Sequence, residues 1–398
     1  MREESGVAAV ILAAGSSSRM GAAKQLLPLR GRPLLQHVLD NVRQSSVREI
    51  VLVLGHSAET VQQAVNLDGA RIVVNEQFQQ GMGTSLKAGL SEVSSRSQAA
   101  LIVLGDQPFV GAPTMDRLIG VHRESRGQII IPTFRGFRGN PVLLDRAVFP
   151  ELKGLSGDVG CRSIFGAHTE EIVRVAVDDV GILLDMDRPE DLRVAHGDIE
   201  RLGQLPAVEI SDPQEPSSVP ADMKSGELVI VGRDVVAIAA AELGRTLGFT
   251  VTMVDPLLPV SDVSADRVLH ALDFSLLEVN SDRHVIVASR GACDEEAIEQ
   301  ALQVKSMYVG LLGNKNRGKE VLRSLQSRGI AEADLARVRV PAGLNIHAET
   351  PQEIALSILA EIVSERRLRL VGRDSTSNSS SAHAEKGGKA IWGIRGSE

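Results

Sequence analysis

The feature that most constrains the fold is a repeated alternation between short, continuous apolar runs and longer amphipathic stretches. The apolar runs of the first half are "AAVILA" (8–13), "REIVLVLG" (48–55), "ARIVVN" (70–75), "AALIVLGD" (99–106), "QIIIPTF" (128–134) and "EIVRVAV" (171–177). Runs without polar interruption are typical of strands that are buried on both faces, and the stretches between them supply covering helices. The pattern predicts an α/β domain with a doubly wound, mostly parallel sheet. In such a sheet, ligands bind beyond the carboxyl ends of the strands.

A second series of the same kind begins after residue 226, with "ELVIVG" (227–232), "TVTMVD" (250–255), "RHVIVAS" (283–289) and "MYVGLLG" (307–313). At 398 residues the chain is long enough for two cores. The segment before this series is rich in Pro, Ser and acids, and the end of the chain is rich in Ser and Gly. We therefore predict a first domain (1–197), a linker (198–226), a smaller second domain (227–368) and a disordered tail (369–398).

Composition excludes several classes of function. The net charge of −8 gives no broad positive surface for nucleic acid or for an anionic membrane, so a small anionic ligand is expected instead. The two cysteines, Cys161 and Cys293, form neither a CxxC pair nor a Cys/His cluster, which argues against a disulfide framework or a zinc site. No apolar run approaches the roughly 18 residues of a membrane span, and a reducing cytoplasm is the expected location.

The loop after the first apolar run, "GSSSRMGAAK" (15–24), combines small residues with two cations. Gly15 and the serines allow backbone N–H groups to approach a phosphate, and Arg19 and Lys24 supply positive charge. The loop lacks the GxxxxGK[ST] spacing of a P-loop. From the residues alone, it is either an anion cradle or a solvated turn.

The stretch "LAAGSSSRMGAAKQLLPLRGRPLL" (12–35) resembles the signature of nucleotidyltransferases that act on the molybdenum cofactor, above all their cytidylyltransferase branch. It reads LAAG, whereas the guanylyl enzymes typically have LAGG. The resemblance implies catalytic roles for Arg19, Lys24 and Asp106. It also implies a nucleotide site formed by Leu12, Ala13, Ala14, Gly15, Ser18, Arg19, Lys24, Gly81, Ser85 and Asp106.

Two acidic segments agree with this resemblance. "VLGDQPFV" places Asp106 after an apolar run, and "LLDMDRPEDL" contains Asp185 and Asp187. The family holds Mg²⁺ with one aspartate from each segment, which implies Asp106 and Asp187 as metal ligands. Taken singly, each is as readily a turn residue or a helix cap.

Three further segments resemble the same family with less defined roles. In "NEQFQQGMGTSLKAGL", Gly81 and Ser85 either face the ligand or belong to a turn in which Thr84 caps a helix. In "GFRGNPVLL", Asn140 replaces a histidine that the family usually carries. In "SGDVGCRSIF", Cys161 stands where the family commonly has Ala, and we interpret it as a packing residue rather than a nucleophile.

Residues 227–367 resemble the Rossmann-like half of accessory proteins that mature xanthine dehydrogenase and related molybdenum hydroxylases, through "YVGLLGNKNRGKEVLRSL", "RVRVPAGLNI" and "ETPQEIALSILAEIV". The family's first turn reads GxGxxG, whereas this chain has "GRDVVA", with Asp234 and Ala237 at the second and third glycine positions. A carboxylate at position 234 disfavours a dinucleotide in the usual pose, although Asp255 retains the place of a ribose-binding acid. We expect this domain to dock a target enzyme or to help hold the cofactor.

Together these resemblances imply Mg²⁺-dependent cytidylyl transfer from CTP to Mo-molybdopterin. The products would be the molybdopterin cytosine dinucleotide cofactor and pyrophosphate, and the reaction would be coupled to maturation of a molybdenum hydroxylase apoenzyme such as xanthine dehydrogenase. The acceptor phosphate, a monoester, is largely ionised at neutral pH, so no general base is required. One alternative is a nucleotidyltransferase with another base or acceptor, such as GTP or a sugar phosphate. The other is a cofactor-binding insertion chaperone with little turnover.

Overall fold

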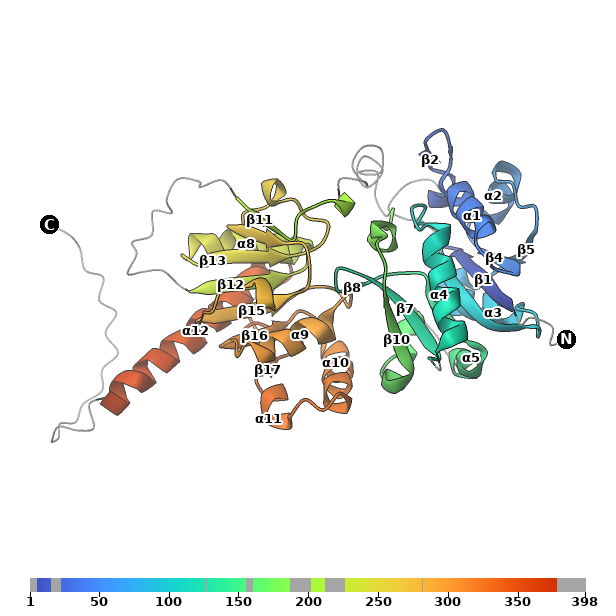
Figure 1. Cartoon of the computed structure of the whole chain (residues 1–398). Coiled ribbons are helices and arrows are strands. Elements are labelled where there is room, and N and C mark those ends of the chain that lie inside the picture. Colours follow the sequence, from blue (N-terminus) through green and yellow to red (C-terminus); the bar gives the residue numbers. More distant parts are fainter. Residues whose placement is uncertain are drawn as a thin grey trace.

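The computed structural model of the chain describes residues 6–15, 23–125, 127–154, 160–186, 202–211, 226–280 and 282–377. These residues form two α/β domains that lie side by side, each built on its own sheet (Figure 1). The doubly wound, mostly parallel fold predicted for both domains is therefore confirmed. Within the described ranges, no helix has the length and apolarity that a membrane crossing requires.

The first sheet has the strand order β10-β7-β9-β6-β1-β4-β5. Strand β1 (Gly6–Ala13) lies at its centre and runs parallel to β4 (Glu49–Leu54) and β6 (Ser97–Leu104). The remaining strands are β5 (Ala70–Val74), β7 (Ile129–Phe134), β8 (Phe137–Arg138), β9 (Val142–Asp145) and β10 (Ile172–Ala176). Strand β9 is antiparallel to both of its neighbours, β6 and β7. The carboxyl ends of β1, β4, β5 and β6 consequently share one edge of the sheet.

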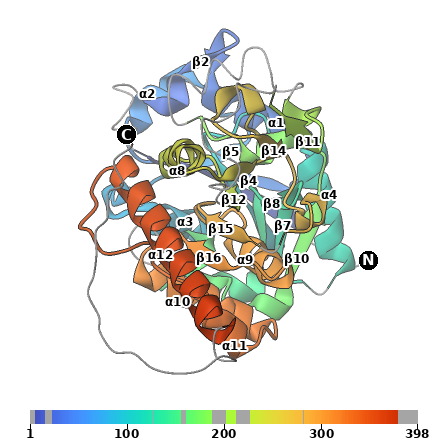
Figure 2. The ribbon, with the colours of Figure 1, turned by 90° about the vertical axis from the view of Figure 1, so that its left-hand side faces the viewer.

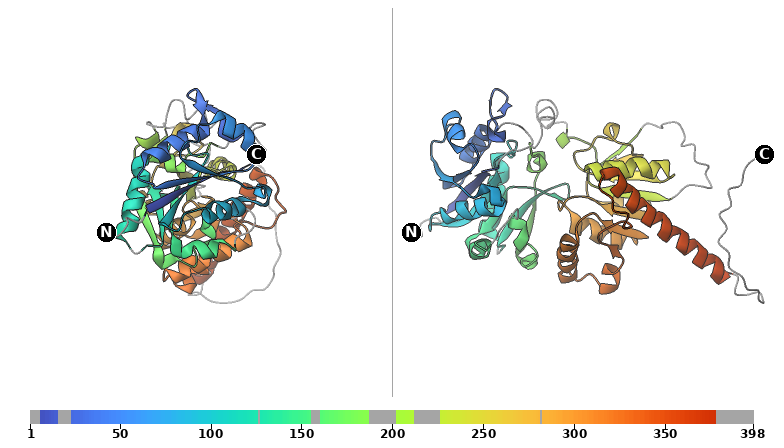
Figure 3. Two further views of the ribbon diagram at one scale, coloured as in Figure 1. Left: turned by 90° about the vertical axis from the view of Figure 1, so that its right-hand side faces the viewer. Right: turned by 180° about the vertical axis from the view of Figure 1, so that it is seen from behind.

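Helices cover both faces of this sheet (Figure 3). Alternate side chains of β1 point to opposite faces, so that Val7 and Ile11 join one apolar cluster while Ala8 and Val10 join another. The first cluster includes α1 (Leu34–Gln44), α2 (Ala58–Ala64) and α4 (Ala112–Glu124). The second includes α3 (Met82–Ser91) and α5 (Phe149–Leu152).

The second sheet has the order β11-β14-β13-β12-β15-β16-β17. Its strands are β11 (Val208–Ile210), β12 (Glu227–Val231), β13 (Thr250–Val254), β14 (Arg267–Leu269), β15 (Arg283–Val287), β16 (Tyr308–Leu311) and β17 (Val338–Arg339). One face is covered by α8 (Val235–Thr246) and α12 (Pro351–Ser377); α12 runs across the foreground of Figure 2. The other face is covered by α9 (Asp294–Gln303) and α10 (Lys315–Ser327), beside the short α11 (Glu332–Leu335).

The structure differs from the sequence-based prediction in the linker, in the tail and in several short strands, among them β14 and β17, which were not predicted. The predicted linker contains β11, which pairs antiparallel with β14 and so extends the second sheet. The tail expected to be disordered from residue 369 begins as helix, because α12 continues to Ser377 before the Ser-rich run; residues 378–398 lie outside the described ranges. The β8 and β9 strands were not predicted, since β8 is too short to show periodicity and β9 is an antiparallel insertion.

A buried ion pair joins the two domains. Arg138, at the end of β8, donates from Nη2 to Oε2 of Glu295 on α9 over 2.6 Å, and both side chains are only 8% exposed. The backbone N–H of Arg138 also donates to the carbonyl of Ala292, 2.9 Å away. Burial lowers the pKa of Arg138, but the charges of Glu295 and Glu296 outweigh it and the net direction is upward. Arg138 therefore remains charged at the centre of the interface.

Candidate functional site

The carboxyl end of β1 is packed tightly against its neighbouring strands. The N–H of Gly105, which follows β6, donates to the carbonyl of Leu12, and a Cβ at Gly105 would lie 2.8 Å from that of Ala13. At the end of β4, a Cβ on Gly55 would lie 2.7 Å from the carbonyl oxygen of Ala14. Only glycine fits at these two positions, and both glycines bring the following residues close to the end of β1.

The structure brings together two of the predicted catalytic residues, Lys24 and Asp106. Lys24 opens a short 3₁₀ helix (Lys24–Leu26), and Asp106 follows β6, 82 residues further along the chain. The Nζ of Lys24 donates to Oδ2 of Asp106 over 2.7 Å, and the two side chains are 13% and 31% exposed. The other carboxylate oxygen, Oδ1, is buried and has no hydrogen-bond partner within the described ranges.

Several predicted residues fall outside the described ranges, namely Ser18 and Arg19 of the loop and Asp187 of the second acidic segment. Gly15, the last described residue before this part of the loop, has open space where a Cβ would be. The last described residue before Asp187 is Met186, whose N–H donates to the backbone carbonyl of Asp106 over 3.0 Å. The chain that leads into Asp187 is thus attached to the backbone of Asp106.

Two residues of this edge were missed in the sequence analysis. The Nε2 of Gln25 donates to the carbonyl of Ala13 over 2.7 Å, which ties the end of the loop to the end of β1. After β5, the Nδ2 of Asn75 donates to Oγ1 of Thr84 and to Oγ of Ser85, at 2.9 and 3.0 Å. The sequence offered a signal for both residues. Gln25 follows Lys24 in the recognised motif, and Asn75 is a polar residue directly after an apolar run.

The predicted residues Gly81 and Ser85 lie at the start of α3. Gly81 precedes the helix with a φ of 106°, and Ser85 is buried. Thr84 does not cap the helix through its side chain, because its hydroxyl donates back to the carbonyl of Gly81 over 2.9 Å. The turn is therefore held by Asn75 and Thr84 together.

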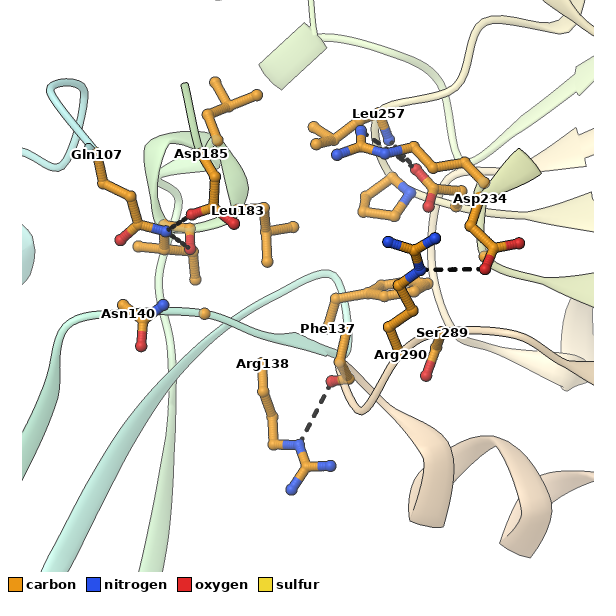
Figure 4. A pocket seen from close by; sticks show the side chains of 18 of the residues that line it. Gln107, Phe137, Arg138, Asn140, Leu183, Asp185, Asp234, Leu257, Ser289 and Arg290 are labelled. Atoms are coloured by element: carbon orange, nitrogen blue, oxygen red, sulfur yellow. Dashed lines mark hydrogen bonds and ion pairs between the residues drawn. The ribbon is translucent and has the colours of Figure 1, made fainter. Parts of the chain in front are cut away.

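A cavity of about 640 Å³ lies between the two domains, and Gln107, the residue after Asp106, lines it (Figure 4). On the first-domain side, the Nε2 of Gln107 donates to Oδ1 of Asp185 over 2.6 Å, and Asn140 lies nearby. On the second-domain side, the wall is formed by residues at the carboxyl ends of β12, β13 and β15, including Asp234, Asp255 and Ser289. A volume of this size is ordinary for a small-molecule site.

The N-terminus of α8 is occupied by the chain's own carboxylate. Oδ1 of Asp234 accepts hydrogen bonds from the backbone N–H groups of Val236 and Ala237, at 3.0 and 2.8 Å. Oδ2 of the same residue pairs with Nε of Arg290 over 3.1 Å. A dinucleotide pyrophosphate in the usual pose would need these N–H groups, so the geometry agrees with the sequence argument against that pose.

Asp255, at the place of a ribose-binding acid, is buried in the same wall. Its Oδ1 accepts a hydrogen bond from the N–H of Leu257 over 2.9 Å, and Arg233 lies 3.8 Å away. Burial raises the pKa of Asp255, and the partial compensation by Arg233 and by the hydrogen bond does not reverse that direction.

Cys161 should be unreactive at neutral pH. Burial raises the pKa of its thiol to about 11, against a smaller opposing effect from the charge of Arg162. Because only the thiolate reacts, the rate of alkylation by iodoacetamide should rise about tenfold per pH unit between pH 7 and pH 10. Mass spectrometry of the Cys161 peptide measures this rate, and a plateau reached below pH 8 would contradict the inert role. The fully buried Cys293 is the internal reference.

Comparison with known proteins identifies both halves of the chain. Residues 9–172 match the MobA-like NTP transferase domain, and residues 228–362 match the XdhC Rossmann domain. Nicotine blue oxidoreductase of Paenarthrobacter nicotinovorans is 35% identical over 165 residues, which cover 39% of this chain and 79% of that protein. The uncharacterized protein YqeB of Escherichia coli is 35% identical over 144 residues, 34% of this chain, but the match spans only 26% of YqeB.

Among solved structures, Rv0371c of Mycobacterium tuberculosis is 35% identical, with coverage of 49% of this chain and 98% of that chain and a TM-score of 0.45. The family match over residues 9–172 shows that the first half of the chain is a nucleotidyltransferase domain. The chain belongs to the MobA-like NTP transferase family, and it carries an XdhC Rossmann domain in the same polypeptide.

Proposed function

We propose that the chain transfers a cytidylyl group from CTP to Mo-molybdopterin and releases pyrophosphate. The observation that carries this proposal is the contact between Lys24 and Asp106 at the carboxyl edge of the first sheet, in a chain of the MobA-like family. Lys24 belongs to the loop whose LAAG motif resembles the cytidylyl branch. Its amino group would bind the triphosphate, together with Arg19 and the backbone from Leu12 to Ser18.

Asp106 and Asp187 would hold Mg²⁺ in this reaction. The buried Oδ1 of Asp106, which has no hydrogen-bond partner among the residues that the structure describes, supports the fit, because an acceptor without a donor is well suited to a cation. Carboxylate oxygens are also the ligands that Mg²⁺ prefers. When bound, the metal neutralises charge on the phosphates and aligns their oxygens for in-line displacement. The described residues contain no cluster of three or more potential ligands, so the second carboxylate would come from position 187.

The rest of the catalysis consists of positioning the two substrates for the transfer. An oxygen of the acceptor phosphate forms a bond to the α-phosphorus of CTP, and the bond from that phosphorus to the bridging oxygen of pyrophosphate breaks. The attacking phosphate monoester is already ionised at neutral pH, so the chain needs no residue to remove a proton. Lys24 and Arg19 would stabilise the charge that develops on the phosphate oxygens.

The second domain supports a role in maturation of a molybdenum hydroxylase such as xanthine dehydrogenase. It matches the XdhC Rossmann domain, and the α8 N-terminus that would bind a dinucleotide is already capped by Asp234. Tethering this domain to the transferase keeps the product at a high effective concentration beside the domain that would deliver it. The cytoplasm is the compartment in which we expect this delivery.

Pyrophosphate release tests the reaction. We expect Mg²⁺-dependent release from CTP only when Mo-molybdopterin is present, and little release from GTP, ATP or UTP. Addition of EDTA should abolish release, and excess Mg²⁺ should restore it, because without the cation the aspartate carboxylates would repel the triphosphate. Release with another base, or without the cofactor, would contradict the proposed substrates. No release with any nucleotide from folded protein would favour a chaperone.

A second candidate function rests on the relative from Paenarthrobacter, whose name describes an oxidoreductase acting on nicotine blue. Reduction of nicotine blue would need an electron donor, and NADH and NADPH are the donors we would supply. A loss of absorbance at 340 nm that depends on nicotine blue would support this candidate. A constant absorbance together with CTP-dependent pyrophosphate release would exclude it in favour of transfer.

A further inference from the structure

The cavity between the domains extends the nucleotidyltransferase site away from the nucleotide loop. Its first-domain wall begins at Gln107, directly after Asp106, whereas Gly15 and Lys24 do not line it. The cavity therefore borders the residue after Asp106 but is separate from the loop residues that would hold the triphosphate. A second substrate bound there would lie outside the nucleotide loop.

Three guanidinium groups other than that of Arg138 line this cavity: Arg162 from the first domain, and Arg233 and Arg290 from the second. Arg290 is 72% exposed, and among the described residues its side chain pairs with Asp234 alone, which leaves other donors for a ligand. The side chain of Arg233 is 42% exposed, and its pairing with Asp255 is loose at 3.8 Å. Arg162 has no ion-pair partner in the described part of the chain.

These arginines differ from Arg138, which also borders the cavity. Nη2 of Arg138 is shared between Glu295 and the carbonyl of Gly291, and the whole side chain is buried. Arg138 therefore fixes the two walls relative to one another. A Cβ at Gly291 would lie 2.9 Å from Nη1 of Arg162, so this glycine also makes room for the arginine from the opposite domain.

Arg290 occupies a backbone conformation that favours glycine. Its φ is 51°, and that of the following Gly291 is 88°. An L-residue in this region is locally disfavoured, so the turn after β15 would be more stable with glycine at position 290. The side chain extends from this turn between the two walls of the cavity, toward Asp234 (Figure 4).

We propose that the cavity between the domains binds the phosphate-bearing acceptor, and that Arg233 and Arg290 of the second domain, with Arg162 of the first, contact its anionic groups. The inference rests on the proposed function, because the acceptor is the substrate of that transfer. The planar guanidinium group binds phosphate oxygens through paired donors. The amide of Asn140, on the facing wall, is suited to a polar heterocycle. The second domain thus supplies half of the acceptor site.

Arg290→Gly is the most informative variant, because it removes the guanidinium group and also removes the backbone strain that a positive φ imposes on a residue other than glycine. We expect its melting temperature to equal or exceed that of the wild type, while the KM for Mo-molybdopterin rises at least about tenfold. The KM for CTP and the kcat should stay within about twofold, since the nucleotide loop and Asp106 are untouched. Arg290→Lys should recover part of the lost affinity for the acceptor. Arg233→Ala should raise the KM for the acceptor in the same way as Arg290→Gly.

Arg339→Ala is the matched control. Arg339 belongs to the same domain and also donates from Nε to one carboxylate, that of Glu365 at 2.7 Å, but it does not line the cavity. Its removal should leave the KM for the acceptor unchanged. An unchanged acceptor KM in both Arg290→Gly and Arg233→Ala would overturn the inference, as would a parallel loss of CTP and acceptor binding.

Retention of Mo-molybdopterin by the protein in ultrafiltration, without nucleotide, separates this inference from the proposed function. If the wild type releases pyrophosphate and Arg290→Gly retains the cofactor as well as the wild type does, only the inference is overturned. If no nucleotide supports transfer but retention still depends on Arg290 and Arg233, the reaction is overturned and the cavity is supported as a cofactor site. A wild type that neither transfers nor retains overturns both.

Discussion

Replacement of Asp106 by Asn is expected to lower the rate of pyrophosphate release by about a thousandfold. The change keeps the shape of the side chain but removes the charge that contacts Nζ of Lys24, and it replaces the acceptor pair that would hold a cation. Single-turnover measurement with saturating CTP and Mo-molybdopterin gives the rate of the chemical step. Because Asp106 is partly exposed, the loss of its ion pair should change the free energy of unfolding by no more than about 1 kcal/mol.

Asp116→Asn provides the control for this experiment. Asp116 is an exposed carboxylate on α4, where Oδ1 accepts hydrogen bonds from the backbone N–H and the hydroxyl of Ser46, at 2.7 and 2.6 Å. Its removal takes the same charge from the same domain at a place remote from the edge of the sheet, and activity should be retained. Near-normal turnover of Asp106→Asn, with circular dichroism like that of the wild type, would remove Asp106 from the proposed metal site.

Arg138→Ala is expected to destabilise the contact between the two domains by about 3–5 kcal/mol. The substitution leaves Glu295 buried without its partner, and desolvation of that uncompensated carboxylate is the main cost. Calorimetry should show the two domains melting at more widely separated temperatures. A double-mutant cycle with Glu295→Ala measures the coupling, and the double variant should be less destabilised than the sum of the two single variants.

A second arginine at the same interface tests whether burial of the ion pair causes the large loss of stability expected for Arg138→Ala. Arg174, on β10, donates from Nη2 to Oε1 of Glu296 over 2.6 Å, but its side chain is 32% exposed. Solvent screening limits such a pair, so Arg174→Ala should cost no more than about 1 kcal/mol. Equal losses for Arg138→Ala and Arg174→Ala would show that burial does not set the strength of this contact.

Much of the fold could be predicted from local pattern. The apolar runs that contain β1, β4, β6 and β12 are buried on both faces, and each was recognisable because no polar residue interrupts it. The short β8 has no periodicity, and β11 lies in a segment that composition marks as linker. These strands exist because neighbouring strands offer unpaired backbone groups, and this is information that a local window does not contain.

The residues of the candidate site also fall into those that a local motif predicts and those that only the tertiary structure reveals. Lys24 and Asp106 could each be selected from a motif, since both lie directly beside an apolar run in a recognisable segment. Their direct contact across 82 residues of chain is a property of the sheet, in which β6 lies beside β1. Gln25 and Asn75 were missed because amides are common in loops, and only their partners distinguish them.

The sequence by itself determined the two α/β domains, the loop with Arg19 and Lys24, the acidic strand end at Asp106 and the replacement of a Rossmann glycine by Asp234. Each of these features depends on the order of residues within a short segment, because hydrophobic periodicity and the conformational freedom of the backbone are local properties. Only the tertiary structure decided that Arg138 pairs with Glu295 and that Arg290 and Gln107 line one cavity. The reason is physical. Burial of a charge and closure of a cavity depend on residues that lie close in space but far apart in the sequence, so no local sequence pattern predicts them.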